Sequence, residues 1–188
     1  NKEEWKNASK VSLDFEFNPG YNTTPDKKTE VYVLYSNKNL YVGFFAYDDS
    51  SSIRASIRQR DDFNIFINDD FVNIKLDTYG DSRNNYNLSS NPLGSQADAR
   101  QTDAIEEEES YDLNYNIEFE TSGKIVNNGY NVEYKIPFKN LPFTNKKNQE
   151  WKFRFYRKTY RDGNEVEFIS SKYDRNNSCD VCQTNDIL

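Results

Sequence analysis

The stretch Asp69–Arg100 concentrates acidic side chains at the ends of two expected strands and in the turn between them. Loop carboxylates, together with carbonyls and waters, are the oxygen ligands that calcium takes in proteins. The spacing is not that of an EF-hand loop, and turn capping or ion pairing with Arg83 explains the same acids equally well. The candidate calcium ligands are Asp69, Asp70, Asp77, Asp81 and Asp98.

Amide, guanidinium and aromatic groups in and after this stretch suit hydrogen bonding and ring stacking. Ligand pockets typically combine aromatic walls with a few placed polar groups. The candidate ligand-binding residues are Arg83, Asn91, Gln96, Arg100, Tyr111, Tyr115 and Trp151. Tyr115 and Trp151 each share the alternation of a hydrophobic strand, which favours the core for both and leaves Tyr111 as the better stacking residue. A structural turn is the first expectation for Asn91.

The chain lacks the residues that several kinds of chemistry require. The chain has no histidine, which removes Ser-His-Asp and Cys-His catalysis, and no methionine, so neither usual neutral axial ligand for haem is available. Glycoside hydrolysis needs two carboxylates at a fixed separation, and no compact acidic motif of the Glu-x-Asp-x-x-Glu kind is present. We therefore expect a binding module and no enzyme, with no haem or nucleotide cofactor.

Two cysteines, Cys179 and Cys182, are separated by two residues near the C-terminus. One such pair without histidines cannot complete a four-ligand zinc site, and no βαβ pattern of the thioredoxin kind surrounds it. A local disulfide or two unreactive thiols are the remaining interpretations.

The net charge of −7 disfavours nucleic acid and anionic lipid, because both call for a basic surface. No apolar run is long enough to span a membrane as a helix. A divalent cation or a neutral polar ligand suits this charge better. The chain starts abruptly at Asn1, so we expect a processed or excised fragment.

Alternating hydrophobic residues predict the elements that carry these side chains. Expected strands include residues 11–17, 30–35, 40–47, 71–76, 84–90, 115–119, 130–136, 151–155 and 166–168. Residues 30–35 and 40–47 form an expected hairpin, residues 63–67 alternate as a strand would, residues 122–129 form an expected turn, and residues 138–141 form one expected helical turn. Roughly nine to eleven strands with little helix predict an antiparallel β-sandwich of jelly-roll or Greek-key type.

The sandwich is expected to cover residues 1–170. Residues 171–188 are expected to form a loosely ordered C-terminal extension that contains the cysteine pair. Residues 94–112 are expected to be the least regular part of the sandwich. The acidic run Glu106–Glu109 is expected to be a solvated loop, with calcium binding as the alternative.

The ordered set of segments resembles a known family. It comprises W-K-N-A, E-V-Y-V-L-Y, N-L-Y-V-G-F-F-A-Y-D, D-D-F-V-N-I-K-L-D-T-Y-G-D, N-P-L-G-S-Q-A-D, G-Y-N-V-E-Y-K-I-P-F-K-N-L and W-K-F-R-F-Y-R. Together these resemble the family 9 carbohydrate-binding-module superfamily, a DOMON-like β-sandwich. The version found at the N-terminus of Bacteroidetes outer-membrane β-barrel proteins is the most similar. The resemblance extends over about residues 1–170.

The resemblance implies a non-catalytic module that binds a mono- or oligosaccharide and holds structural calcium. It also implies an exported setting, at the cell surface, on the outer membrane or in the periplasm. Sugar-binding members of the family clamp the sugar between tryptophans, whereas Tyr111 and Tyr115 stand at the aromatic positions here. The alternative is an accessory domain that contacts an outer-membrane protein partner without binding sugar.

Overall fold

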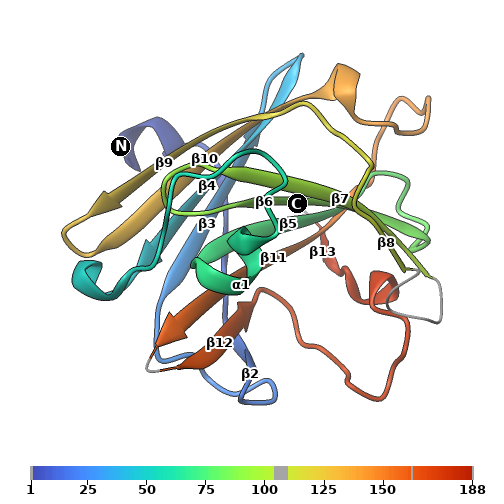
Figure 1. Ribbon diagram of the computed structural model, residues 1–188. Coiled ribbons are helices and arrows are strands. Elements are labelled where there is room, and N and C mark those ends of the chain that lie inside the picture. The colour runs from blue at the N-terminus through green and yellow to red at the C-terminus, as the bar shows by residue number, and fades with distance from the viewer. Residues whose placement is uncertain (1, 104–109, 162, 188) are drawn as a thin grey trace.

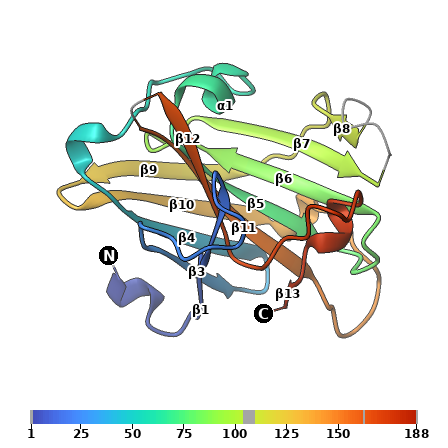
Figure 2. The same ribbon diagram turned by 90° about the horizontal axis from the view of Figure 1, so that it is seen from below.

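The chain folds into two antiparallel β-sheets packed face to face, as the computed structural model shows (Figures 1 and 2). The structure describes residues 2–103, 110–161 and 163–187. The acidic run Glu106–Glu109 lies outside these residues. The prediction of an all-β antiparallel sandwich is confirmed.

The smaller sheet has five strands and sets two hairpins that are distant in the sequence side by side. The expected hairpin of residues 30–35 and 40–47 is confirmed at its centre. In spatial order the strands are β1 (Ser9–Ser12), β3 (Thr29–Tyr35), β4 (Asn39–Tyr47), β10 (Gly129–Pro137) and β9 (Glu120–Val126).

The larger sheet has eight strands and brings distant parts of the chain together, since β11 pairs with β5. In spatial order the strands are β2 (Phe15–Asn18), β12 (Asn164–Ile169), β11 (Lys152–Arg161), β5 (Phe71–Asp77), β6 (Asn84–Ser90), β7 (Gln96–Thr102) and β8 (Tyr111–Asp112). A short strand, β13 (Asp186–Ile187), also pairs with β11.

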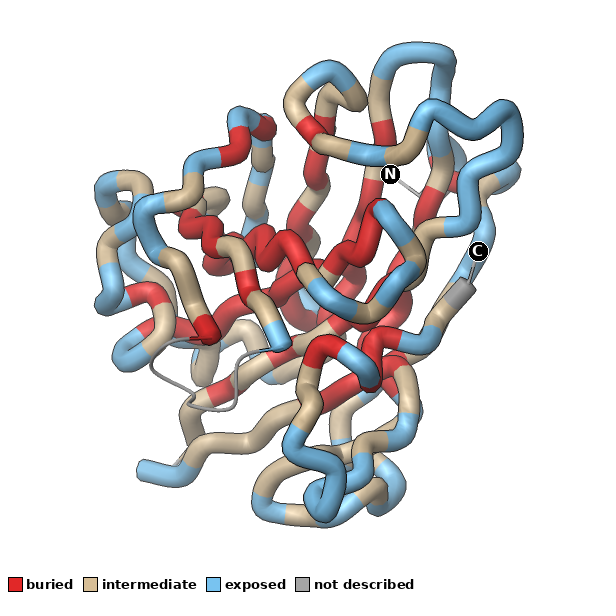
Figure 3. Tube along the Cα trace, turned by 90° about the vertical axis from the view of Figure 1, so that its right-hand side faces the viewer, coloured by how far each residue is buried: buried red, intermediate tan, exposed pale blue. Residues whose placement is uncertain are grey.

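The core lies between the two sheets and follows the hydrophobic alternation of the strands. Val72, Ile74 and Leu76 of β5 face Val42 and Phe44 of β4, and all five side chains are fully buried. Burying a side chain of this size stabilises a fold by about 1.5–3 kcal/mol. Figure 3 shows the buried residues running along the strands and the exposed ones in the connections. The alternation therefore decides which side of each strand faces outward.

Helical structure is short in the part of the chain that the structure describes. The elements are η1 (Lys2–Trp5), η2 (Ser50–Ser52), α1 (Asn64–Asn68), η3 (Phe138–Asn140) and η4 (Val181–Gln183). The expected helical turn before Pro142 is confirmed as η3. None of these helices is long and apolar enough to cross a membrane.

Several local expectations were wrong, each for a physical reason. Residues 63–67 form α1 instead of a strand, because only Ile65 packs inward while Phe63 and Ile67 stay exposed. Residues 11–17 divide into β1 and β2, which belong to different sheets. Residues 96–102, expected to be irregular, form β7.

The segment 115–119 is not a strand, although its alternation is real. The carboxylate of Asp98 accepts a hydrogen bond from the Ile117 amide at 2.6 Å, and Gln96 donates to the Phe119 carbonyl at 3.1 Å. Side chains therefore satisfy backbone groups that a neighbouring strand would otherwise pair. The strand begins instead at Glu120, and the turn into β10 shrinks to the residues just before Gly129.

The C-terminal segment packs against the larger sheet, so the expectation that it is loosely ordered was wrong. Val181 and Gln183 are buried, and β13 adds to the sheet beside β11. Cys179 and Cys182 form a disulfide, which confirms one of the two interpretations of that pair. A domain boundary near residue 170 stays a prediction.

Candidate functional site

The five candidate calcium ligands are spread over the sandwich, and each accepts hydrogen bonds from the protein. Asp69 forms a two-point ion pair with Arg58 at 2.8 and 2.9 Å and also accepts from Asn91. Asp70 pairs with Arg161 at 2.8 and 2.9 Å. These two neighbouring carboxylates thus neutralise buried or half-buried arginines.

The other three candidate ligands hold backbone turns and connections. Asp77 accepts from the amides of Tyr79, Gly80 and Ser82 at 2.7–3.0 Å, which closes the turn after β5. Asp81 is exposed and accepts from the Arg83 amide at 3.1 Å.

The last of the three, Asp98, pairs with Arg60 as well as with the Ile117 amide. Among the described residues, no three histidine, cysteine, aspartate or glutamate side chains gather in a way that could hold a metal ion. Calcium binding stays a prediction.

Most of the predicted ligand-binding residues serve the framework. Asn91 is fully buried, and its side-chain oxygen accepts from the amides of Leu93 and Ser95. Gln96 bridges Arg60 and the Phe119 carbonyl. Arg83 lies exposed in the turn between β5 and β6.

Of the three aromatic candidates, Tyr115 and Trp151 pack against the core, as their alternation predicts, and Tyr111 does not. Tyr115 packs on Tyr86, with ring centroids 5.6 Å apart, and the Arg100 guanidinium lies 5.0 Å from its ring centre. Trp151 packs against the core and makes an edge contact with Phe138. Tyr111 alone reaches the outer face of the larger sheet, the face turned away from the smaller sheet, where Lys75 donates to its hydroxyl at 3.4 Å.

This outer face is polar over β5, β6 and β11. The strand register sets Arg154 beside Lys75 and Lys75 beside Asn87, and it sets Tyr156 beside Asn73. Opposite side chains on neighbouring strands are close enough to act on one ligand. The small side chain of Ala99 follows Asn87 in the same row.

Two amides on this face have polar atoms without a partner among the described residues. The Oδ1 atom of Asn73 accepts no hydrogen bond from the protein, the Nδ2 atom of Asn87 donates none, and both atoms are buried. Both residues are 6% exposed. The Nδ2 atom of Asn73 donates to Ser89 at 2.8 Å, which orients the free oxygen. A free acceptor and a free donor therefore lie on adjacent strands.

Tyrosines and charges surround these amides. Burial raises the pKa of Tyr156, whose hydroxyl contacts the Glu167 carboxylate, and burial also raises the pKa of Glu167. The Arg154 guanidinium lies 5.1 Å from the ring centre of Tyr173, which comes from the C-terminal segment. We call this group the outer-face site; its residues are Asn73, Lys75, Asn87, Tyr111, Arg154, Tyr156, Glu167, Tyr173 and Asp180.

Asp180 connects the charges of the outer-face site. It pairs with Lys75, accepts from Gln101 at 2.8 Å and pairs with Arg154 at 3.0 Å. Burial alone would raise the pKa of Asp180, but the positive charges of Lys75 and Arg154 outweigh burial and lower it to about 2. The carboxylate is thus ionised at neutral pH, and the charges on this face are balanced.

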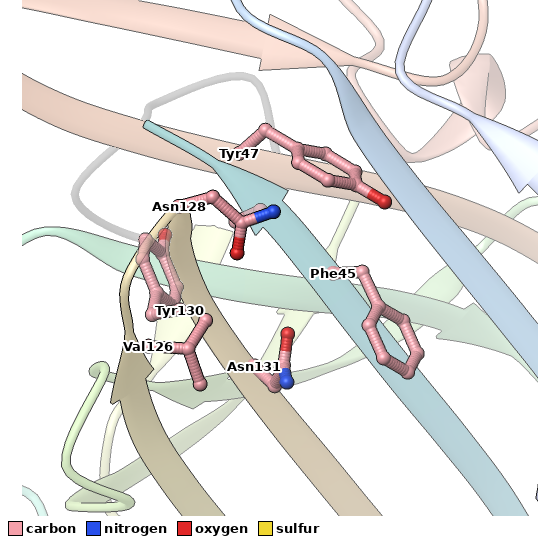
Figure 4. Close-up of a pocket in the computed structure, with 7 residues that line it drawn as sticks. Phe45, Tyr47, Val126, Asn128, Tyr130 and Asn131 are labelled. Atoms are coloured by element: carbon pink, nitrogen blue, oxygen red, sulfur yellow. The ribbon is translucent and has the colours of Figure 1, made fainter. Parts of the chain in front are cut away.

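Two hollows elsewhere on the surface are less suited to a ligand. One, of about 520 Å³, is lined by Arg60, Asn116, Glu118 and Asn140, but Arg60 and Asn140 already donate to other protein groups. The other is shown in Figure 4 beside β4 and β10; it holds only about 120 Å³. This second hollow is smaller than common ligand pockets, which hold about 300–1,000 Å³.

A comparison with known protein families identifies the family of this chain. The family model described as carbohydrate family 9 binding domain-like matches residues 2–179. The chain belongs to this family. A search of curated proteins gives no match for this family 9 domain.

Solved structures share its fold. A family 9 carbohydrate-binding module from Caldicellulosiruptor kristjanssonii in complex with glucose matches with a TM-score of 0.64 and 16% identity, over 97% of this chain and 84% of that chain. The same module with cellotriose matches with a TM-score of 0.63 and 16% identity, over 97% and 83% of the two chains.

A protein from Bacteroides uniformis ATCC 8492, proposed to bind carbohydrate, matches with a TM-score of 0.63 and 13% identity, over 92% and 82%. At these identities the three likenesses show a shared fold and no more.

Sequence reasoning missed most of the outer-face site of this family 9 domain. It weighed polar groups at strand ends, whereas these residues stand within strands, at the positions that alternate with the core. Asn73 and Lys75 alternate with the core residues Val72, Ile74 and Leu76. This alternation could have predicted that Asn73 and Lys75 point away from the core. Asp180 and Tyr173 carried no such signal, because they lie outside any alternating segment.

Proposed function

We propose that this family 9 domain binds a neutral mono- or oligosaccharide on the outer-face site and catalyses no reaction. Family membership and the glucose and cellotriose complexes of a module with the same fold support a sugar as the ligand class. The balance of charge on the outer-face site suits a neutral ligand. The tyrosines offer ring faces and hydroxyls.

One observation carries the choice of this face: the unpartnered, buried amide atoms of Asn73 and Asn87. Leaving a buried donor or acceptor unpaired costs about 1–3 kcal/mol. A sugar hydroxyl both donates and accepts, so a single ring can pair with the Asn87 nitrogen and the Asn73 oxygen together once the side chains that bury these atoms move aside. Binding would recover the free energy that the unliganded fold loses at these two atoms.

Calorimetric titration with glucose and cellotriose tests the proposal. We expect Asn87→Ala to weaken binding about tenfold, because one hydrogen bond to the ligand is lost. The same change removes an unsatisfied buried group, so the melting temperature should stay constant or rise. Asn148→Ala, at an exposed position, is the matched control and should bind as the unchanged protein does.

Two outcomes would contradict the proposal. An absence of binding to both sugars, and to a wider glycan array, would rule out this ligand class. Sugar binding that Asn87→Ala and Asn73→Ala leave unchanged would move the site elsewhere on the domain.

We further propose an exported setting, as part of an outer-membrane or cell-surface protein. The Cys179–Cys182 disulfide supports it, because disulfides persist in oxidising compartments. The alternative, an accessory domain that contacts a protein partner, is favoured by exposed apolar side chains around α1: Ile57 is 88% exposed, Phe63 58% and Ile67 49%. Co-purification with a membrane protein in the absence of sugar binding would support this alternative.

A further inference from the structure

The C-terminal segment supplies a carboxylate to the outer-face site from a distant part of the chain. Asp180 lies 105 residues from Lys75 and 26 residues from Arg154 along the sequence. The side chains of Lys75 and Arg154 are 14% and 3% exposed, so both cations are largely removed from water. Such cations need a paired anion and a fixed geometry.

Asp180 itself is held by a short covalent ring. It lies between Cys179 and Cys182, whose disulfide spans the beginning of η4. Next to it, Gln183 donates from its side chain to the carbonyls of Asp174 and Asn177 at 3.1 and 3.2 Å. No strand pairs with residues 173–185 among the described residues. The residues after Asp180 are also held, since Val181 is buried and Arg154 donates to the Gln183 carbonyl. The disulfide therefore fixes the Asp180 backbone together with these contacts.

We propose that Asp180 is a positioning residue of the outer-face site and that the Cys179–Cys182 disulfide, together with the buried Val181, holds it over Lys75 and Arg154, so that ligand affinity requires the oxidised cysteine pair. This inference rests on the proposed function, because its first test measures the affinity for sugar. With the disulfide open, Asp180 moves away, Lys75 and Arg154 lose their common partner, and the wall of the site next to Asn87 loses its shape.

The disulfide is chemically accessible, since Cys182 is exposed. A dithiol reductant opens it by thiolate attack on one sulfur, which gives a mixed disulfide, followed by release through the second thiolate of the reductant. The S–S bond breaks, the two protein sulfurs gain two electrons and two protons, and the reductant becomes a cyclic disulfide.

Calorimetric titration of the whole chain with cellotriose tests the inference under three conditions: oxidised, reduced with dithiothreitol, and as the Cys179→Ser/Cys182→Ser variant. We expect binding about tenfold weaker in the last two, with an unchanged far-ultraviolet circular dichroism spectrum. Asp180→Asn should weaken binding to the same extent while the disulfide remains intact. Asp174→Asn removes an exposed carboxylate of the same segment and should leave affinity unchanged.

A readout without sugar separates this inference from the proposed function. The acetylation rate of Lys75, followed by mass spectrometry with exposed Lys139 as internal reference, should rise about tenfold on reduction. The amine then loses its carboxylate partner and keeps only the neutral Gln101 and Tyr111 side chains. If sugar binds but neither affinity nor Lys75 reactivity responds to reduction, the inference is wrong and the proposed function stands. If no sugar binds, the proposed function fails, and Lys75 reactivity alone decides whether the disulfide positions Asp180.

Discussion

The guanidinium of Arg157 lies 2.7 Å from the carboxylate of Asp48, inside the sandwich, and joins the two sheets. Arg157 belongs to β11 of the larger sheet and also donates to the Thr29 hydroxyl and the Tyr47 carbonyl of the smaller sheet. Asp48 pairs with Arg161 as well, at 2.6 Å. A network of buried charge therefore links strands that are far apart in the sequence.

Asp48→Ala should destabilise the fold more than Arg157→Met. Without Asp48, the fully buried charge of Arg157 has no counter-ion, and breaking a buried pair in this way costs about 3–5 kcal/mol. Without Arg157, Asp48 keeps its pair with Arg161. Urea unfolding of both variants measures the two losses, and an equal or reversed order would show that the network does not act as described.

The stability contributed by Asp180 should depend on pH in the acid range. Its folded pKa, about 2, lies below the ordinary 3.8. Its contribution is therefore present above pH 4 and is lost as pH falls towards 2. At about 1.4 kcal/mol per pKa unit, the contribution is about 2 kcal/mol. The difference in unfolding free energy between the unchanged protein and Asp180→Asn should shrink by that amount from pH 5 to pH 2; a constant difference would contradict the ion pairs.

Gly43→Ala should displace Trp5 from the smaller sheet. A Cβ atom at position 43 would lie 2.7 Å from Cζ2 of Trp5, a side chain that is 6% exposed. Overpacking of this kind costs about 1–3 kcal/mol. In a Trp151→Phe background, Trp5 fluorescence should shift to the red. The same glycine change made in Trp5→Ala should cost almost nothing, and a full cost there would exclude this contact as the cause.

Tyr111 and Tyr115 should respond differently to truncation. Tyr111 lies at the outer-face site, so Tyr111→Ala should weaken cellotriose binding about tenfold with little change in melting temperature. Tyr115 packs on Tyr86, so Tyr115→Ala should lower the melting temperature and keep the affinity. Titration and thermal unfolding of the two variants distinguish these results, and weaker binding in Tyr115→Ala alone would reverse the assignment.

Chelation tests the calcium prediction. Asp69, Asp70, Asp77 and Asp98 already pair with arginines or accept backbone hydrogen bonds, so a melting temperature that EGTA leaves unchanged would assign all four to the framework and contradict the prediction. A lower melting temperature that added calcium restores would establish an ion that stabilises the folded state.

The sequence by itself determined the fold class and the two faces of most strands. Alternation in residues 71–76 separates Val72, Ile74 and Leu76 from Asn73 and Lys75, because successive side chains of a strand point to opposite sides. The same reasoning recognised Tyr115 and Trp151 as core positions. It misread residues 63–67, where only Ile65 packs inward, and residues 115–119, where the side chains of Asp98 and Gln96 pair with the backbone.

Only the tertiary structure decided which outward side chains share a site. Lys75, Arg154 and Asp180 meet because β11 pairs with β5 and the C-terminal segment folds back over both strands. Pairing between distant strands depends on the packing of the whole core, and no local pattern records it. The acids of Asp69–Arg100 illustrate the same limit, because their spacing suggested one cluster. Instead, Asp69, Asp70 and Asp98 pair with three different arginines, and Asp77 and Asp81 hold the turn after β5.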